Sequence, residues 1–187
     1  MEITMFGLFG KNKFRETTQG IYTTIVEQSR QPGFYLNCGV PDTPEGRFDM
    51  IVVHTFLVIR LLKDESGEAA DLAQAIFDML FADMDQNLRE MGTGDMGVGK
   101  KIKAMAEAFY GRLKAYEDGL TGEGSLEEAL DRNLYRNTTP LPAHIEAFAL
   151  YMRREARQLE ERTVPKLLAG DITFGPVPPV SDESNDR

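Results

Sequence analysis

Cysteine and histidine are nearly absent from this sequence of 187 residues, which has one cysteine, Cys38, and two histidines, His54 and His144. A single cysteine excludes an internal disulfide framework. So few sulfur and imidazole ligands also argue against a structural zinc site. A chain of this length can bury a hydrophobic core without either kind of crosslink.

Long hydrophobic runs are missing too, and no stretch reaches the roughly 18 apolar residues of a transmembrane helix. The best candidate, residues 50–62, is interrupted by His54 and Arg60. Residues 1–16 place a few apolar side chains before basic ones, so this segment could touch an anionic membrane surface. It lacks the features of a secretory signal or a mitochondrial presequence. We therefore expect a cytoplasmic protein that begins near Met1.

Positive charge is in short supply, with 21 Lys and Arg against 30 Asp and Glu and a formal net charge of −9. This balance argues against bulk binding of nucleic acid but leaves room for a local basic patch. Such a patch occurs in residues 98–116, whose basic side chains are Lys100, Lys101, Lys103, Arg112 and Lys114.

No convincing pair of strands is present, and the hydrophobic periodicity is helical almost throughout. We expect an all-α protein with one domain of about six helices: residues 1–16 as an amino-terminal segment, residues 17–169 as the helical domain and residues 170–187 as a disordered tail. The prolines and glycines of residues 31–42 predict a loop. Ser125 begins a capping box, and the tail is proline-rich and then acidic.

Residues 50–62 are the most ambiguous segment, because their β-branched residues favour a strand. We predict a helix instead, since the run is long and does not alternate, and since Thr43 and Pro44 are typical of a helix start. The predicted helix carries apolar side chains on nearly every side. Either it is the central helix of the domain, or Val53 and Phe56 face a partner, with Arg60 on the same side.

The glycine-rich residues 92–101 resemble two nucleotide-binding motifs by letter. Residues 94–101 come close to a phosphate-binding loop, but Lys101 stands where that loop needs serine or threonine. Both motifs also require a preceding strand, whereas the sequence predicts a helix. A helix cap and an inter-helix turn explain the glycines better. A nucleotide-binding enzyme that uses residues 94–101 remains the alternative function.

No other pattern predicts catalysis, a cofactor or a metal. Neither His54 nor His144 lies in a recognisable motif with a serine or cysteine nucleophile. The partner-binding candidates are therefore the basic side chains of residues 98–116 together with Tyr110, which shares a helical stripe with Lys100, Lys103 and Lys114. These side chains could contact phosphate, RNA or an acidic partner. Alternatively, they form an ordinary solvated face.

Two blocks of the sequence resemble a known family. They are residues 40–49, VPDTPEGRFD, and residues 95–112, DMGVGKKIKAMAEAFYGR. Both are similar to the ubiquinol–cytochrome c chaperone family, the assembly factors for cytochrome b of respiratory complex III. The proline that usually precedes the basic pair in that family is Gly99 here.

The resemblance implies an all-helical chaperone of the bacterial form and not an enzyme. Its client would be nascent cytochrome b. Its further partners would be a second small assembly chaperone and the ribosome, with peripheral contact at the cytoplasmic face of the inner membrane. A helical scaffold without a membrane client is the remaining alternative.

Overall fold

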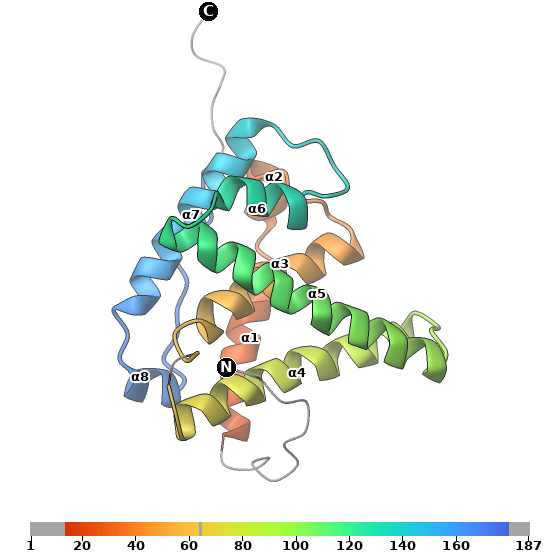
Figure 1. Ribbon diagram of the computed structural model, residues 1–187, viewed down its shortest axis with the longest axis vertical. Coiled ribbons are helices and arrows are strands. Elements are labelled where there is room, and N and C mark those ends of the chain that lie inside the picture. The colour runs from red at the N-terminus through yellow and green to blue at the C-terminus, as the bar shows by residue number, and fades with distance from the viewer. Residues whose placement is uncertain (1–13, 64, 180–187) are drawn as a thin grey trace, which may run out of the picture.

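Helix α3, Pro44–Ile59, is the helix around which the others pack in the computed structural model of the protein (Figure 1). The structure describes residues 14–63 and 65–179. Within these ranges there are eight helices and no strand, which confirms the predicted all-α class. The other helices are α1 (Arg15–Ser29), α2 (Pro32–Asn37), α4 (Glu68–Glu90), α5 (Asp95–Thr121), α6 (Leu126–Asn133), α7 (Pro142–Glu160) and α8 (Val164–Leu168).

The start of α3 follows from its sequence. The Thr43 side chain accepts a hydrogen bond from the Gly46 N–H at 3.1 Å, and Pro44 occupies the first turn, where its missing N–H costs nothing. Every residue from position 49 to position 59 is buried. A helix enclosed on all sides has no polar face. The sequence therefore shows neither alternation nor an amphipathic stripe, and α3 is the central helix.

Two hydrophobic clusters lie on different sides of α3. Val53 and Phe56 belong to a cluster with residues of α6 and α7, while Val52 and Ile59 belong to one with residues of α1 and α4. Helix α5 crosses α3 and contributes to both clusters (Figure 1). The beginning of α5 and the end of α4 project together beyond the rest of the bundle (Figure 1).

Two short helices were not expected from the sequence. Residues 31–42 were predicted as a loop, but Pro32 begins α2 as a first-turn proline, and the fully buried Phe34 anchors it. Helix α7 ends at Glu160, and Pro165 then lies in the first turn of α8 instead of inside a longer helix. Proline therefore starts these helices instead of breaking them.

The predicted disordered tail is wrong for residues 170–179. This segment packs on the domain, with Ile172 and Pro178 buried and Phe174 touching both hydrophobic clusters. The Gly175 N–H donates to Glu155 at 2.7 Å, and the Gly175 carbonyl accepts from Gln28 at 2.9 Å. Its apolar side chains hold the segment in place despite its prolines. We call residues 171–179 the C-terminal strap.

Two predicted segments lie partly outside the described residues. The membrane contact assigned to residues 1–16 falls mostly on residues 1–13, and the remainder of the predicted tail is residues 180–187. Residues 15 and 16 belong to α1. Among the described helices, none is both long enough and apolar enough to cross a membrane.

Candidate functional site

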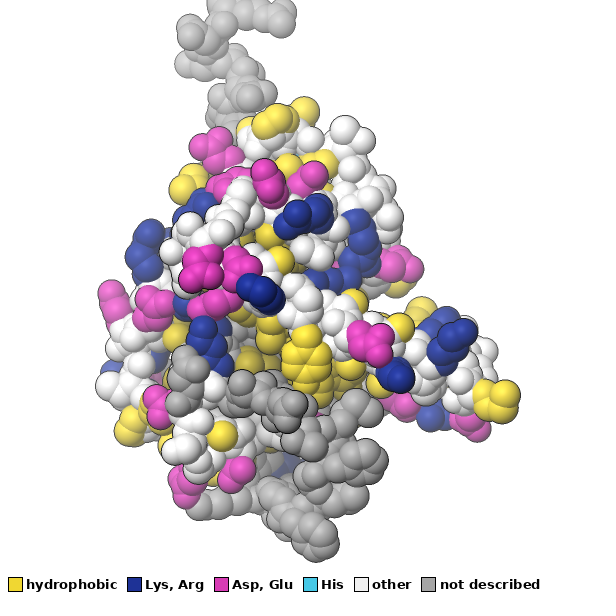
Figure 2. All heavy atoms as spheres, in the orientation of Figure 1, with side chains coloured by type: hydrophobic (Ala, Val, Ile, Leu, Met, Phe, Trp, Pro, Cys, Tyr) yellow, Lys and Arg dark blue, Asp and Glu magenta, His cyan; other side chains and the backbone are white. Residues whose placement is uncertain are grey.

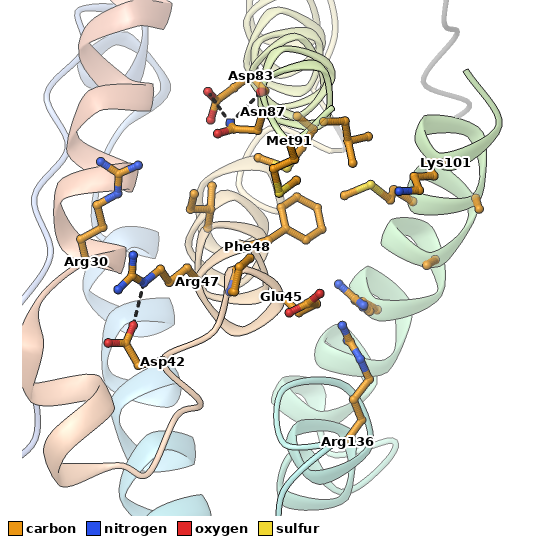
Figure 3. A pocket seen from close by; sticks show the side chains of 18 of the residues that line it. Arg30, Asp42, Glu45, Arg47, Phe48, Asp83, Asn87, Met91, Lys101 and Arg136 are labelled. Carbon is orange, nitrogen blue, oxygen red and sulfur yellow. Dashed lines mark hydrogen bonds and ion pairs between the residues drawn. The ribbon is translucent and has the colours of Figure 1, made fainter. Parts of the chain in front are cut away.

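A groove of about 1290 Å³ opens beside the amino-terminal half of α3 (Figure 3). We call it the central groove. Helices α3, α4 and α5 form most of it, and Arg30, residues of α2 and Arg136 complete its edges. Its lining includes both apolar and charged side chains, among them Glu45, Phe48, Met84, Leu88, Lys101, Ala104, Met105, Ala108, Arg112 and Arg136.

The groove exists because one face of α5 carries small side chains. Lys101, Ala104, Ala108 and Arg112 follow each other at intervals of three and four residues, and Met105 lies four residues after Lys101, which places them all on one side of the helix. Ala104 and Ala108 end at Cβ, so they leave open the space between this face and α3. Both alanines are exposed in the protein.

Methionines and a phenylalanine supply much of the apolar lining. Met84, Met91 and Met105 come from the α4–α5 pair, and Phe48 comes from α3. Met91 is 62% exposed, and Leu36 of α2, which also lines the groove, is 78% exposed. Figure 3 shows Phe48 and Met91 pointing into the same space. Because methionine side chains are flexible and polarisable, this lining can adapt to apolar surfaces of different shape.

The lining is more basic than the chain as a whole. Five basic side chains line the groove: Arg30, Arg47, Lys101, Arg112 and Arg136. Three acidic ones do: Asp42, Glu45 and Asp83. Arg47 pairs with Asp42 at 2.6 Å, and Asp83 accepts a hydrogen bond from the Tyr22 hydroxyl at 2.8 Å. The groove thus offers positive charge in a protein whose net charge is −9.

A buried carboxylate, that of Asp49, lies behind the basic side chains of the groove. Asp49 is 3% exposed, and its two oxygens pair with Arg112 at 2.6 Å and with Arg136 at 2.8 Å. Burial raises the pKa of Asp49 to about 6, and the two guanidinium groups oppose that rise. At neutral pH the carboxylate is therefore ionised, and it holds both arginines at the groove.

The predicted basic side chains of α5 fall on two different faces. Lys101 and Arg112 line the central groove. Lys100, Lys103 and Lys114 are exposed and lie outside it, and Lys114 pairs with Asp118 at 2.8 Å. The projecting end of the α4–α5 pair shows both basic and acidic side chains in Figure 2. Whether these lysines bind a partner remains a prediction.

Tyr110 belongs to an aromatic cluster between α4 and α5. Its ring stacks on Phe77 with the centroids 5.8 Å apart, and Phe81 and Phe109 complete the cluster. Tyr110 is 39% exposed, and Figure 2 shows hydrophobic side chains at the surface between these two helices. Its ring is thus largely engaged in packing α4 against α5.

The candidates on α3 do not form a partner surface. Val53 and Phe56 are buried, with 0% and 2% exposure, so the prediction that they face a partner is wrong. Arg60 pairs with Glu117 at 3.0 Å and with Glu160 at 2.7 Å, which ties the end of α3 to α5 and α7. The open apolar surface beside α3 belongs to the central groove instead.

The histidines and the cysteine serve packing. Burial raises the pKa of the Cys38 thiol to about 11, which disfavours a reactive thiolate. His54 is fully buried beside Ser29 and Tyr151. His144 lies against Gly39. In the part of the chain that the structure describes, no group of three or more His, Cys, Asp and Glu side chains could hold a metal ion.

The glycine-rich segment does not have the form of a nucleotide-binding loop. The element before it is helix α4, not a strand, and α5 already begins at Asp95 with Gly94 as its N-cap. Gly97, Gly99 and Lys101 therefore lie inside a helix. The predicted start near residue 98 was a turn late, and the alternative of a nucleotide-binding enzyme loses the structural context that it requires.

Comparisons with known proteins identify a family and relatives of this chain. The family described as Ubiquinol-cytochrome C chaperone matches residues 36–174. Ubiquinol-cytochrome c reductase complex assembly factor 1 from Homo sapiens is 25% identical over 171 residues, which cover 90% of this chain and 57% of the human protein. The Xenopus laevis protein is 24% identical over 171 residues, which cover 86% of its length.

A solved structure shares the fold. The crystal structure of the Cbp3 homolog from Brucella abortus superposes with a TM-score of 0.80 at 37% sequence identity, and the match covers 87% of this chain and 90% of that one. The family match spans most of this chain, including all of α3, α4 and α5, which form most of the central groove. The chain belongs to the ubiquinol–cytochrome c chaperone family.

Proposed function

We propose that this protein is an assembly chaperone for ubiquinol–cytochrome c reductase. It binds newly made cytochrome b in the central groove and protects it until assembly. The observation that carries the proposal is an open groove with an apolar, methionine-rich lining in a member of this family. The names of the relatives support the assembly role, although this chain spans only 57% of the human protein.

The groove suits an apolar polypeptide segment for physical reasons. An unassembled membrane helix exposes hydrophobic side chains that aggregate in water, and a groove that covers them removes this cost. A flexible methionine lining accommodates different side chains without a fixed template. Binding and release by this route need no covalent chemistry.

We assign the second face of α5 to other partners. Lys100, Lys103 and Lys114 point away from the groove, so a client and an acidic partner can bind α5 at the same time. A second small chaperone or the ribosome would provide the complementary negative charge. Contact with the cytoplasmic face of the inner membrane would place the protein where cytochrome b is inserted.

Affinity capture in mild detergent tests the client assignment. The tagged protein is isolated from cells that synthesise cytochrome b, and enrichment of cytochrome b is measured. Lys101→Glu, which reverses a charge in the groove, is expected to lower the captured amount several-fold, whereas the neighbouring Lys100→Glu is expected to leave it unchanged. Absence of cytochrome b from the wild-type capture would favour a scaffold without a membrane client.

A further inference from the structure

Two arginines share one carboxylate at the wall of the central groove. Asp49 accepts hydrogen bonds from Arg112 and Arg136 through its two oxygens. Within the described part of the chain, the bonds of each guanidinium involve only Nη1: Arg112 Nη1 donates to Asp49, and Arg136 Nη1 pairs with Asp49 and donates to the Asn133 carbonyl at 2.8 Å. Since a guanidinium carries five N–H donors, both arginines retain donors for a further acceptor, and both line the groove.

The charges of this wall do not cancel. At neutral pH, Arg112 and Arg136 carry two positive charges against the one negative charge of Asp49. Arg112 is only 13% exposed, so solvent screens its charge weakly. Lys101 adds another positive charge on the same face of α5, and Glu45, which is exposed, adds a negative one near the mouth. Figure 3 shows Glu45 and Arg136 directed into the same part of the groove.

An entirely apolar occupant would be a poor match for this wall. It would cover Arg112 and Arg136 without supplying an acceptor, and a buried donor without a partner costs free energy. An occupant with a carboxylate would pair with the unused donors, and the fork of a guanidinium binds a carboxylate through two parallel hydrogen bonds. The apolar lining and the arginine pair therefore select different parts of one ligand.

We propose that the central groove recognises an apolar helix of its client that carries an acidic side chain, and that Arg112 and Arg136 bind this carboxylate. The inference rests on the proposed function, because it defines what the client must present. A polypeptide fits better than a lipid, since the two exposed alanines of α5 form a shallow face along which a helix can lie and the methionines adapt to its side chains.

Matched peptides test this proposal. Peptides of about 20 residues, a length that spans a membrane as a helix, are made to tile cytochrome b. Each acidic peptide has a copy in which Asp and Glu are replaced by Asn and Gln. Dissociation constants are measured by fluorescence anisotropy in mild detergent, and a photo-crosslinker at position 108 confirms that a bound peptide occupies the groove. Arg136→Gln is compared with Arg132→Gln, which removes the charge of an exposed arginine outside the groove.

The wild type is expected to bind at least one acidic peptide about tenfold or more tightly than its amide copy, the range of a charge-assisted hydrogen bond. In Arg136→Gln this ratio is expected to fall toward one, while Arg132→Gln retains it. Circular dichroism and thermal melting establish that both variants fold. Retention of Arg112 in Arg136→Gln leaves Asp49 with one partner, so the variant keeps part of the buried pair.

Four results would overturn the inference, and they differ in what else they affect. Equal binding of acidic and amide peptides would leave the groove as a client site without recognition of a carboxylate. A preference that survives in Arg136→Gln would place the recognition elsewhere. Displacement of the peptides by nanodiscs of phosphatidylglycerol, but not of phosphatidylcholine, would assign the arginines to lipid headgroups. If no peptide crosslinked in the groove, the proposed client site itself would fail as well.

Discussion

His54 connects three helices through hydrogen bonds in the core with Ser29, Met50 and Tyr151, and its ring packs against the C-terminal strap. Its Nδ1 lies 2.8 Å from the Met50 carbonyl, which can only accept, so this nitrogen carries the hydrogen. Its Nε2 then accepts from the Tyr151 hydroxyl at 2.8 Å, and the ring packs edge-on against Phe174 of the strap. Every polar atom of the ring is therefore satisfied in the neutral form.

Acid is expected to weaken the fold through His54. Burial lowers its pKa to about 4, below the value of about 6.5 for an unfolded chain. Its contribution to stability is therefore complete above pH 6.5 and is lost as the pH falls toward 4, because the unfolded chain binds the proton more readily. The free energy of unfolding of the wild type should drop by about 3 kcal/mol relative to His54→Gln between pH 7 and pH 4.

Denaturant titrations of both proteins across this range give the comparison. Using the difference between them removes the contribution of other groups, such as Asp49, whose raised pKa acts in the opposite direction. Parallel pH profiles for the two proteins would show that His54 is not the responsible group.

Gly39 is required by its backbone and by its neighbour. Its φ is 61°, and an added Cβ would lie 2.4 Å from Nδ1 of His144. Gly39→Ala is expected to lower the free energy of unfolding by roughly 2 kcal/mol. Gly111→Ala is the control, because nothing lies within 4 Å of its added Cβ inside α5, and it should be neutral or stabilising. Equal thermal stability of the two variants would refute this account of Gly39.

At the residue scale, local interactions were predictable and distant ones were not. The caps at Thr43 and Ser125 are confirmed, since each cap bonds an N–H three residues ahead. Ser66, whose hydroxyl could also begin a helix, does not cap α4, because Gly67 stands at the N-cap position. The pairing of Asp49 with Arg136 joins residues far apart in the sequence, and no local pattern signals it.

The C-terminal strap shows how composition misleads at the scale of an element. Three prolines in residues 170–187 predicted disorder, yet proline is compatible with an extended segment that needs no ladder of N–H donors. Side chains of the domain hold the strap instead: Arg154 donates to the Pro176 carbonyl and Asn37 donates to the Pro178 carbonyl at 2.9 Å. Only the tertiary structure reveals these partners.

Truncation after Gly170 is expected to lower the free energy of unfolding by roughly 4 kcal/mol. The loss reflects exposure of the core beneath Ile172 and Phe174 and removal of the N–H that bonds the fully buried Glu155. Urea denaturation measures it, and truncation after Pro179, which retains the whole strap, is the matched control. An equal loss in both truncations would contradict a stabilising role of the strap.

The central groove was missed because α5 was interpreted as having one inner and one outer face. In fact it has three faces: one packed in the core, one along the groove and one toward solvent. Met105 was assigned to the core stripe, although it also lines the groove. The spacing of Ala104 and Ala108 beside Lys101 was the available signal, but small side chains on a helix also occur at close helix contacts.

For the whole molecule, helical periodicity was sufficient to predict the class of the fold, because each long helix buries its own stripe. It could not predict how the helices diverge to leave a groove. That property depends on the angle between α5 and α3 and on the space that two alanines leave unfilled.

A bulky side chain in the groove should abolish function without unfolding the protein. Ala108→Trp fills part of the groove from an exposed position, whereas Glu107→Trp adds the same side chain outside it. In a strain that lacks the gene, Glu107→Trp is expected to restore mature ubiquinol–cytochrome c reductase and Ala108→Trp to restore little of it. Native gel electrophoresis measures the complex. Full restoration by Ala108→Trp would exclude the groove as the essential site.

Photo-crosslinking in cells tests the central claim most directly. A photoreactive amino acid is placed at position 108, inside the central groove, and in a separate protein at position 107, on the neighbouring face of α5. The account predicts that newly made cytochrome b crosslinks to position 108 and not to position 107. Crosslinking of cytochrome b to position 107 alone, or to neither position, would contradict it.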